Sequence, residues 1–206
     1  SLHKEILITA GNLAYREKLP AYVVGGYVRD MLLGRVSSDI DIMVEGDGVD
    51  FAKKLAKELK INTVVDYEKF ATALIPHADV GIEIATARKE TYSPDSRKPE
   101  VVSCSVSEDM SRRDFTINAI AASILPDNFG ELYDPFCGLK DLQKGLIITP
   151  LDPDETFSDD PLRMLRAVRF AAQLKYDVAP ATLESISRNV ERLAIISWER
   201  IRDEII

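Results

Sequence analysis

The chain has 206 residues, of which 46% are hydrophobic and 29% charged, and its formal net charge is −8 at pH 7. These values fit one substantial globular core, or a medium domain with a smaller appendage, and they exclude binding of nucleic acid through an overall positive surface. No apolar run approaches the roughly 20 residues of a membrane span, and the two cysteines, Cys104 and Cys137, give neither a disulfide framework nor a metal-binding spacing. We therefore expect a cytoplasmic protein.

The first part of the chain alternates helical and strand-like patterns of apolar residues. In order, the predicted elements are a helix over 2–19, a strand over 21–24, a helix over 27–33, a strand over 39–44, a helix over 49–59 and β-rich runs over 61–65, 71–75 and 80–85. The three β-rich runs are short and closely spaced, which favours an antiparallel meander. Residues 87–98 are polar and charged, which predicts a long loop.

The second part of the chain is predicted to be mostly helical. Apolar residues recur at helical intervals over Phe115–Ile124, and a short helix is predicted around Gly138–Gln143. From Asp152 onward the predicted helices cover 160–175, 181–193 and 197–206. Because the pattern changes near residue 150 from mixed α/β to α only, we expect two domains, 1–149 and 150–206. The last helical pattern has no cap, so we expect a piece of a longer protein.

Two aspartates, Asp39 and Asp41, alternate along the strand that follows the short helix. Residues two apart in a strand project from the same face, with Cα atoms about 6–7 Å apart. Carboxylates placed in this way suit a divalent metal ion, and Glu83 would add a third if its strand is a neighbour. The same alternation is typical of a solvated strand face, so the pattern alone leaves both interpretations open.

The glycine pair Gly25-Gly26 stands between the first strand and the short helix that contains Arg29. Backbone N–H groups and the positive end of the helix dipole at such a turn can bind an anion. A glycine turn followed by paired carboxylates therefore favours a site for a nucleotide and its metal ion.

An acid and three arginines recur at intervals of three along one predicted helix. They are Asp160, Arg163, Arg166 and Arg169. Steps of three drift by roughly 60°, so the side chains form a slow spiral, with Leu165, Val168 and Ala172 expected on the opposite, buried side. A solvated helix face is the ordinary alternative. Three cations without interleaved acids favour contact with a base edge or a phosphate, for which the planar guanidinium is suited.

The segment Arg112-Arg113-Asp114 has two interpretations. Asp114 can cap the start of a helix while the two arginines face solvent. Alternatively, the segment can be an arm that reaches a triphosphate and its ribose. The residues alone leave this open.

The order of these motifs is specific. GGYVRD…SSDIDI, a TARKE segment, RRDFTINAIA, YDPFCGLKDLQKG, DDPLRMLRAVRFAAQL and SWERIRDEI together closely resemble the class II tRNA nucleotidyltransferases, or CCA-adding enzymes, and their relatives the bacterial poly(A) polymerases. The resemblance covers nearly the whole chain from Ala21 onward. It implies an α+β fold: a polymerase-beta-like nucleotidyltransferase head with a small mixed or antiparallel sheet flanked by helices, followed by an all-α neck.

The resemblance also implies roles for residues of the head. Asp39 and Asp41 match the metal-binding carboxylates, with Glu83 as the third carboxylate expected from its strand pattern. Gly26 and Arg29 match positions that meet the nucleotide phosphates.

Further roles are implied for the residues that select the nucleotide. Arg113 and Asp114 fall in the motif for ribose recognition, and Asp160 and Arg163 match the pair that reads the incoming base. Arg166 and Arg169 continue this nucleotide-facing stripe. The motif for the flexible element that reshapes the pocket between C and A addition matches Asp134, Gly138, Asp141 and Gly145. Asp159 stands where the family commonly has glutamate, a departure that we do not expect to abolish function.

The implied activity is template-independent addition of C and A to the 3′ end of tRNA, from CTP and ATP, with two Mg²⁺ ions. A poly(A) polymerase, or an enzyme that adds only CC or only A, shares all these motifs. A non-catalytic nucleotide-binding module and a small-molecule nucleotidyltransferase are the remaining alternatives. We expect the chain alone to bind tRNA weakly.

Overall fold

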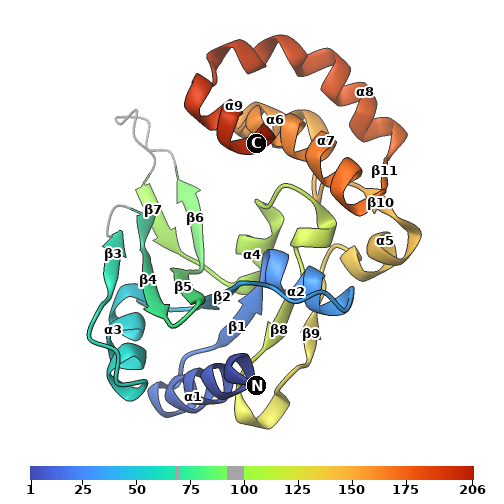
Figure 1. Cartoon of the computed structure of the whole chain (residues 1–206). Coiled ribbons are helices and arrows are strands. Elements are labelled where there is room, and N and C mark those ends of the chain that lie inside the picture. The colour runs from blue at the N-terminus through green and yellow to red at the C-terminus, as the bar shows by residue number, and fades with distance from the viewer. Residues whose placement is uncertain (68–69, 92–99) are drawn as a thin grey trace. The chain divides into compact units, whose positions relative to one another are not determined.

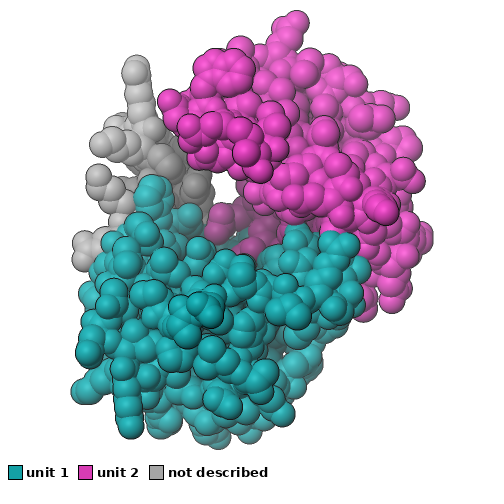
Figure 2. All heavy atoms as spheres, in the orientation of Figure 1, with its two compact units in different colours: residues 1–109, 120–133 teal, residues 110–119, 134–206 magenta. Residues whose placement is uncertain are grey.

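The computed structural model describes residues 1–67, 70–91 and 100–206, which form two compact units. The first unit contains residues 1–109 and 120–133, and the second contains residues 110–119 and 134–206 (Figure 2). None of the helices in the described ranges is both long and apolar enough to cross a membrane. The domain division at residue 150 stays a prediction.

The first unit consists of a sheet with helices packed against it (Figure 1). Its helices are α1 (Leu2–Glu17), α2 (Gly25–Leu32) and α3 (Gly48–Glu58). Its strands are β1 (Ala21–Val24), β2 (Asp39–Val44), β3 (Val65–Tyr67), β4 (Thr72–His77), β5 (Val80–Thr86), β6 (Arg88–Thr91), β7 (Glu100–Ser103), β8 (Ala121–Ser123) and β9 (Leu132–Tyr133). Helix α4 (Val106–Ser111) follows β7.

The main sheet has the strand order β3-β4-β5-β2-β1-β8-β9. Strands β2 and β5 pair in parallel, and the other described neighbours in this sheet are antiparallel. The predicted antiparallel meander over β3, β4 and β5 is confirmed. Because β2 and β5 are parallel, the chain must cross over between them, and α3 lies in that crossover.

One face of the sheet forms the core of the first unit. Ile40 and Ile42 on β2 and Ile82 and Ile84 on β5 are fully buried in a cluster with α1 and α3. Fully burying an isoleucine contributes about 1.5–3 kcal/mol, so a one-residue slip of either strand would be costly. This packing fixes the register and directs the intervening residues to the opposite face.

The prediction of a helix over Phe115–Ile124 is wrong. The segment instead forms a short 3-10 turn, Thr116–Asn118, followed by strand β8, which pairs with β1. Residues 119–124 are all buried, so no polar alternation marks the strand. A short, continuously apolar run does not distinguish a buried strand from a buried helix.

Two further predictions need correction. The β-rich run over 61–65 is displaced, because β3 begins only at Val65 and pairs with β4. The predicted loop begins with a strand, since β6 (Arg88–Thr91) pairs antiparallel with β7. A two-stranded ribbon forms through backbone pairing, which does not require the apolar residues that the prediction looked for. Residues 92–98 of that loop lie outside the described residues.

The second unit is largely helical, as predicted. Its described elements are a 3-10 turn (Thr116–Asn118), α5 (Gly138–Lys144), β10 (Leu146–Ile147), α6 (Pro153–Asp159), α7 (Leu162–Leu174), β11 (Asp177–Val178), α8 (Pro180–Asn189), a 3-10 segment (Val190–Ile195) and α9 (Trp198–Ile205). The predicted helices correspond to α5, α7, α8 and α9; α5 is one residue longer than predicted, and the other three are shorter. Asp152, which accepts from the N–H groups of Asp154 and Glu155, caps α6.

The expected buried side of α7 is wrong. Val168 is 59% exposed and Ala172 is also exposed, whereas the buried residues of the helix are Leu162, Met164, Ala167, Phe170 and Leu174. The prediction assumes that the side opposite the arginine spiral is the buried one, but the guanidinium groups of Arg166 and Arg169 are themselves partly covered by Asp114 and Glu204. Charge pattern alone therefore gave the wrong rotation of the helix.

Gly11 gives the first prediction, because α1 approaches the end of β8 closely at this residue. A Cβ placed there would lie 1.9 Å from the carbonyl oxygen of Ile124. Gly11→Ala must push the helix from the sheet, and we expect a loss of about 1–3 kcal/mol in the free energy of unfolding. Urea denaturation measures it, with Ile8→Ala on the exposed side of α1 as the control. Equal stability of the two variants would contradict the close packing.

Candidate functional site

Asp39, Asp41 and Glu83 project from the sheet face opposite the isoleucine core. Asp41 lies directly opposite Glu83 in the parallel register of β2 and β5. Neighbouring strands are about 4.7–4.9 Å apart, so the carboxylates belong to one small region of the face. The strand of Glu83 is therefore a neighbour of β2, as a third carboxylate at this site requires.

The carboxylate of Asp39 is held by hydrogen bonds from both sides. Its Oδ1 accepts from the N–H of Gly81 at 3.0 Å, and its Oδ2 accepts from the hydroxyl of Ser38 at 3.0 Å. A Cβ on residue 81 would lie only 2.7 Å from Oδ1. Gly81 was missed by the sequence reasoning, although a glycine inside a strand is a signal for such a close approach.

These carboxylates fit a magnesium ion. Mg²⁺ takes oxygen ligands, and it is usually bound by one or two carboxylates together with water and substrate phosphates rather than by a closed protein cage. Among the described residues, no three acidic, histidine or cysteine side chains gather closely enough to hold an ion by themselves. An open pair of aspartates is the donor set that matches this behaviour.

The glycine turn lies beside β2, because β1 pairs with β2 and runs directly into α2. The helix begins at Gly25, two residues earlier than predicted, with a φ of +66° that glycine adopts without strain. The N–H of Gly25 donates to the carbonyl of Ile120 at 3.3 Å. Arg29, which is ion-paired with Asp30 at 2.9 Å, folds back so that its Nη2 would lie 3.5 Å from a Cβ on Gly26. Cationic and backbone donors thus meet at this turn.

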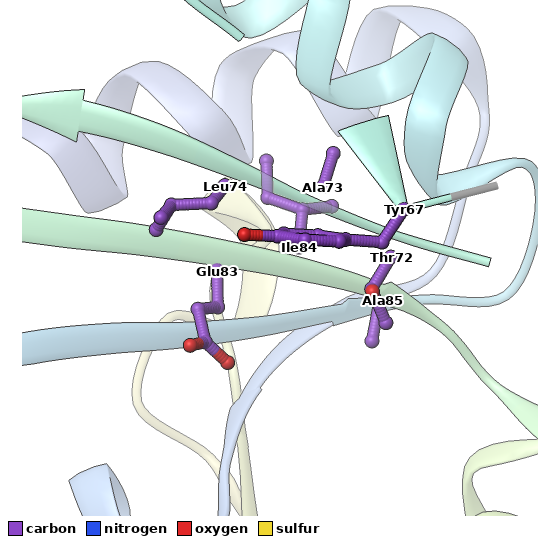
Figure 3. A pocket seen from close by; sticks show the side chains of 7 residues that line it. All are labelled: Tyr67, Thr72, Ala73, Leu74, Glu83, Ile84 and Ala85. Carbon is purple, nitrogen blue, oxygen red and sulfur yellow. The ribbon is translucent and has the colours of Figure 1, made fainter. Parts of the chain in front are cut away.

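A pocket of about 190 Å³ lies on the other side of the carboxylates (Figure 3). It is formed by β3, β4 and β5, and its lining includes Tyr67, Thr72, Leu74 and Glu83. Glu83 therefore belongs both to the carboxylate group and to the wall of this pocket.

In the second unit, Arg166 and Arg169 are paired with buried acids. Arg166 donates from Nε to Asp114 at 2.8 Å, and Glu204 on α9 accepts from both arginines. The two guanidinium groups also lie over the ring of Phe170, at 5.2 and 4.5 Å from its centroid. Burial lowers the pKa of Arg166, but Asp114 and Glu204 outweigh it and raise the pKa above its usual value. Arg166 is therefore held as a cation.

Asp114 does not cap a helix, so that interpretation is wrong. Its Oδ1 accepts from the N–H of Phe115 at 2.7 Å and from the side chain of Asn118 at 3.1 Å, while its Oδ2 accepts from Arg166. Arg113 precedes it and donates its N–H to the carbonyl of Met110. These bonds fix Asp114 in a buried position next to α7.

Asp160 and Arg163 are both held at the start of α7. Asp160 accepts from the N–H of Leu162 at 3.2 Å through Oδ1 and from Arg200 of α9 at 2.9 Å through Oδ2. Arg163 donates to the carbonyls of Thr156 and Arg112, at 3.3 and 2.6 Å. Burial lowers the pKa of the Arg163 guanidinium, and nearby acids partly offset this.

The motif over 134–145 forms α5 and its two ends. Asp134 accepts from the N–H groups of Gly138 and Leu139 at 2.7 and 2.9 Å. Asp141 accepts from the hydroxyl of Thr116 at 2.7 Å, and Gly145 ends the helix with a φ of +69°. The motif is therefore bonded to the segment that follows Asp114.

Alternating carboxylates on one sheet face, next to a glycine turn that opens a helix, define the class of the fold: a polymerase-beta-like nucleotidyltransferase. The sequence profile described as the poly(A) polymerase head domain matches residues 21–148. The chain belongs to this family, which confirms the resemblance seen in the motifs. Enzymes of the nucleotidyltransferase family generally use divalent metal ions.

Similar proteins include two curated relatives and a solved structure. The chain is 43% identical to an A-adding tRNA nucleotidyltransferase of Aquifex aeolicus, over 84% of this chain and 20% of the relative. It is 40% identical to a CCA-adding enzyme of Lactobacillus johnsonii, over 90% of this chain and 45% of the relative. A tRNA nucleotidyltransferase crystallised with a primer tRNA and an incoming ATP analogue superposes with a TM-score of 0.83 at 38% identity, covering 95% of this chain and 54% of that one. The chain thus spans about half of these proteins or less.

Proposed function

We propose that the protein adds C and A to the 3′ end of tRNA, using CTP and ATP, by template-independent nucleotidyl transfer. The observation that carries the proposal is the group formed by Asp39, Asp41 and Glu83, in a chain of the poly(A) polymerase head domain family. The names of the relatives support tRNA as the acceptor. We propose residues 1–149 as the catalytic head and residues 150–206 as part of the neck that selects the nucleotide.

The head residues supply the chemistry common to phosphoryl transfer. Asp39 and Asp41 would hold Mg²⁺, with Glu83 as a third carboxylate. When bound, such ions would lower the pKa of an attacking hydroxyl and neutralise charge on the phosphates. The N–H of Gly26 and the guanidinium of Arg29 would bind the triphosphate, since both offer donors to anionic oxygens.

The neck residues select the base. An ionised aspartate accepts from an exocyclic amine, and an arginine donates to a ring nitrogen or a carbonyl. Asp160 and Arg163 therefore suit cytosine and adenine, which carry an amine where uracil and guanine carry a carbonyl. The hydrogen bonds that Asp160 accepts from Leu162 and Arg200 leave lone pairs for the amine, because a carboxylate has about four acceptor sites.

Four further residues contact the same nucleotide. We assign Arg113 and Asp114 to the ribose and Arg166 and Arg169 to the nucleotide-facing stripe. Each guanidinium has five N–H donors, more than the ion pairs of Arg166 and Arg169 with Asp114 and Glu204 use.

The second candidate function is A addition alone, because A-adding and CCA-adding enzymes are similar to this chain at nearly equal identity. A poly(A) polymerase uses the same motifs. An incubation with tRNA lacking CCA, tRNA ending in CC and an unrelated RNA, each with one labelled nucleotide, separates these functions. Incorporation of both C and A into the tRNA lacking CCA supports CCA addition. Incorporation of A into the tRNA ending in CC, and into no other RNA, supports A addition alone. Long A tracts on any RNA support a poly(A) polymerase. No incorporation by any combination contradicts the proposal.

Gly81 gives a further prediction. Gly81→Ala would displace the carboxylate of Asp39, because the added Cβ collides with Oδ1 while the nearest other atom, of Leu74, is 3.4 Å away. We expect nucleotide addition to fall about 10- to 100-fold, the scale of a misplaced catalytic group, with little change in melting temperature. Wild-type rates in this variant would show that the hydrogen bond from Gly81 does not set the position of Asp39.

A further inference from the structure

The carboxylates on β2 divide their sheet face into two sides. On one side, β1 leads into the glycine turn at Gly25 and Gly26, where the donors for a triphosphate lie. On the other side, β5, β4 and β3 follow in order, and they carry the pocket that begins at Glu83. A nucleotidyl transfer has two substrates that meet at the carboxylates, and the triphosphate occupies the β1 side. The β5 side is left for the acceptor.

The pocket has one aromatic wall and polar groups at its rim. Tyr67 is 46% exposed and lies opposite Thr72 in the register of β3 and β4. Leu74 lies opposite Glu83 in the register of β4 and β5. Figure 3 shows the ring of Tyr67 extending along the strands, with its hydroxyl directed away from the end formed by Thr72 and Ala85. The pocket thus offers an aromatic surface, a hydroxyl and a carboxylate.

This chemistry suits a nucleoside and not a phosphate. Glu83, together with Asp41 on the adjacent strand, repels anionic groups but accepts hydrogen bonds from sugar hydroxyls. Unpaired bases of RNA stack on aromatic side chains, and the contact tolerates any base. The volume of about 190 Å³ is below the roughly 300–1,000 Å³ of pockets that enclose a whole small molecule. It is enough for one base, with its sugar toward the carboxylates.

We propose that Tyr67, Thr72 and Glu83 form the subsite for the 3′-terminal nucleoside of the acceptor RNA. The ring of Tyr67 stacks on the terminal base, and Thr72 and Glu83 hydrogen-bond the sugar side. The reacting 3′-hydroxyl is thereby delivered along β5 toward Asp41. This inference rests on the proposed function, which names an RNA end as the acceptor.

Tyr67→Ala tests the subsite. Stacking of one base on an aromatic side chain contributes about 1–3 kcal/mol, so the KM for an RNA acceptor ending in CC should rise about 5- to 150-fold. The KM for ATP should stay within about twofold, because the triphosphate lies on the β1 side. Tyr67→Phe keeps the ring and should recover most of the acceptor affinity. Val65→Ala is the matched control, since Val65 is the other exposed residue of β3 and does not line the pocket.

A change in the acceptor RNA provides a second test. An RNA whose terminal nucleotide lacks its base should bind the wild-type chain more weakly, and Tyr67→Ala should weaken that RNA no further. Equilibrium binding measures this without turnover. An unchanged acceptor KM, or a rise in the KM for ATP alone, overturns the subsite. If the wild-type chain incorporates no nucleotide, the proposed function fails, while the binding comparison still decides whether Tyr67 contacts a terminal base.

Discussion

Replacing Asp39 and Asp41 together by alanine is expected to reduce nucleotide addition by at least about 10³-fold, because metal ions and preorganised charges at a transferred phosphoryl group supply several kcal/mol of transition-state stabilisation. Asp39 is exposed and Asp41 only half-buried, and the isoleucines on the other face hold the sheet in register. We therefore expect the double variant to fold. Steady-state rates of labelled nucleotide incorporation at saturating Mg²⁺ measure the effect.

Asp79→Ala provides the matched control for this loss. Asp79 is an exposed acid in the turn between β4 and β5, and it is not one of the proposed metal ligands. The Asp79→Ala variant changes the net charge by one unit without removing a proposed metal ligand, and its rate of nucleotide incorporation should stay near that of the wild type. Full activity of the double variant would refute the assignment of the metal ligands.

Changes at Asp160 and Arg163 are expected to alter the choice of base more than the rate. Asp160→Ala removes the acceptor for the exocyclic amine, so CTP and ATP lose an interaction that UTP and GTP never had. A buried unsatisfied polar group costs about 1–3 kcal/mol, which sets the loss of discrimination at about 5- to 150-fold. The ratio of kcat/KM for CTP over UTP, and for ATP over GTP, measures it. A lower rate of incorporation with unchanged kcat/KM ratios would contradict the proposal that Asp160 and Arg163 select the base.

Arg200 refines this second prediction, because it is ion-paired with Asp160 at 2.9 Å. The pair is about half exposed, so Arg200→Ala should leave folding intact and reduce discrimination by no more than about fivefold. Arg202→Ala is the matched control on the same helix, since Arg202 pairs with its neighbour Asp203. Equal effects of the two variants would assign the change to net charge and not to the position of Asp160.

Strong local periodicity made much of the first unit predictable. Strand β2 was predicted with its observed bounds, because Ile40 and Ile42 alternate with aspartates and a half-buried strand requires that alternation. Strand β8 was missed because all its residues are buried, so no alternation of buried and exposed positions marks it as a strand. The parallel pairing of β2 with β5 was not predicted either, because register between distant strands is set by the packing of the whole sheet.

The residue types of the candidate site could be selected from the sequence, but the contacts that hold them could not. Aspartates, glycines and arginines stood out through spacing, and the motifs identified the family. The partners Gly81, Arg200 and Glu204 were missed because each comes from a segment remote from the residue it holds. The sequence does not show that Glu204 pairs with Arg166 and Arg169, so the side of α7 opposite the arginines was wrongly expected to be buried.

Label transfer tests the central claim most directly. The chain is incubated with Mg²⁺, a high concentration of tRNA lacking CCA, and CTP and ATP labelled at either the α- or the γ-phosphate. We predict that the α-label enters the RNA and that the γ-label is released in pyrophosphate, because the 3′-hydroxyl attacks the α-phosphate. Transfer of the γ-label to the RNA, or the absence of α-label from every RNA offered, would contradict nucleotidyl transfer.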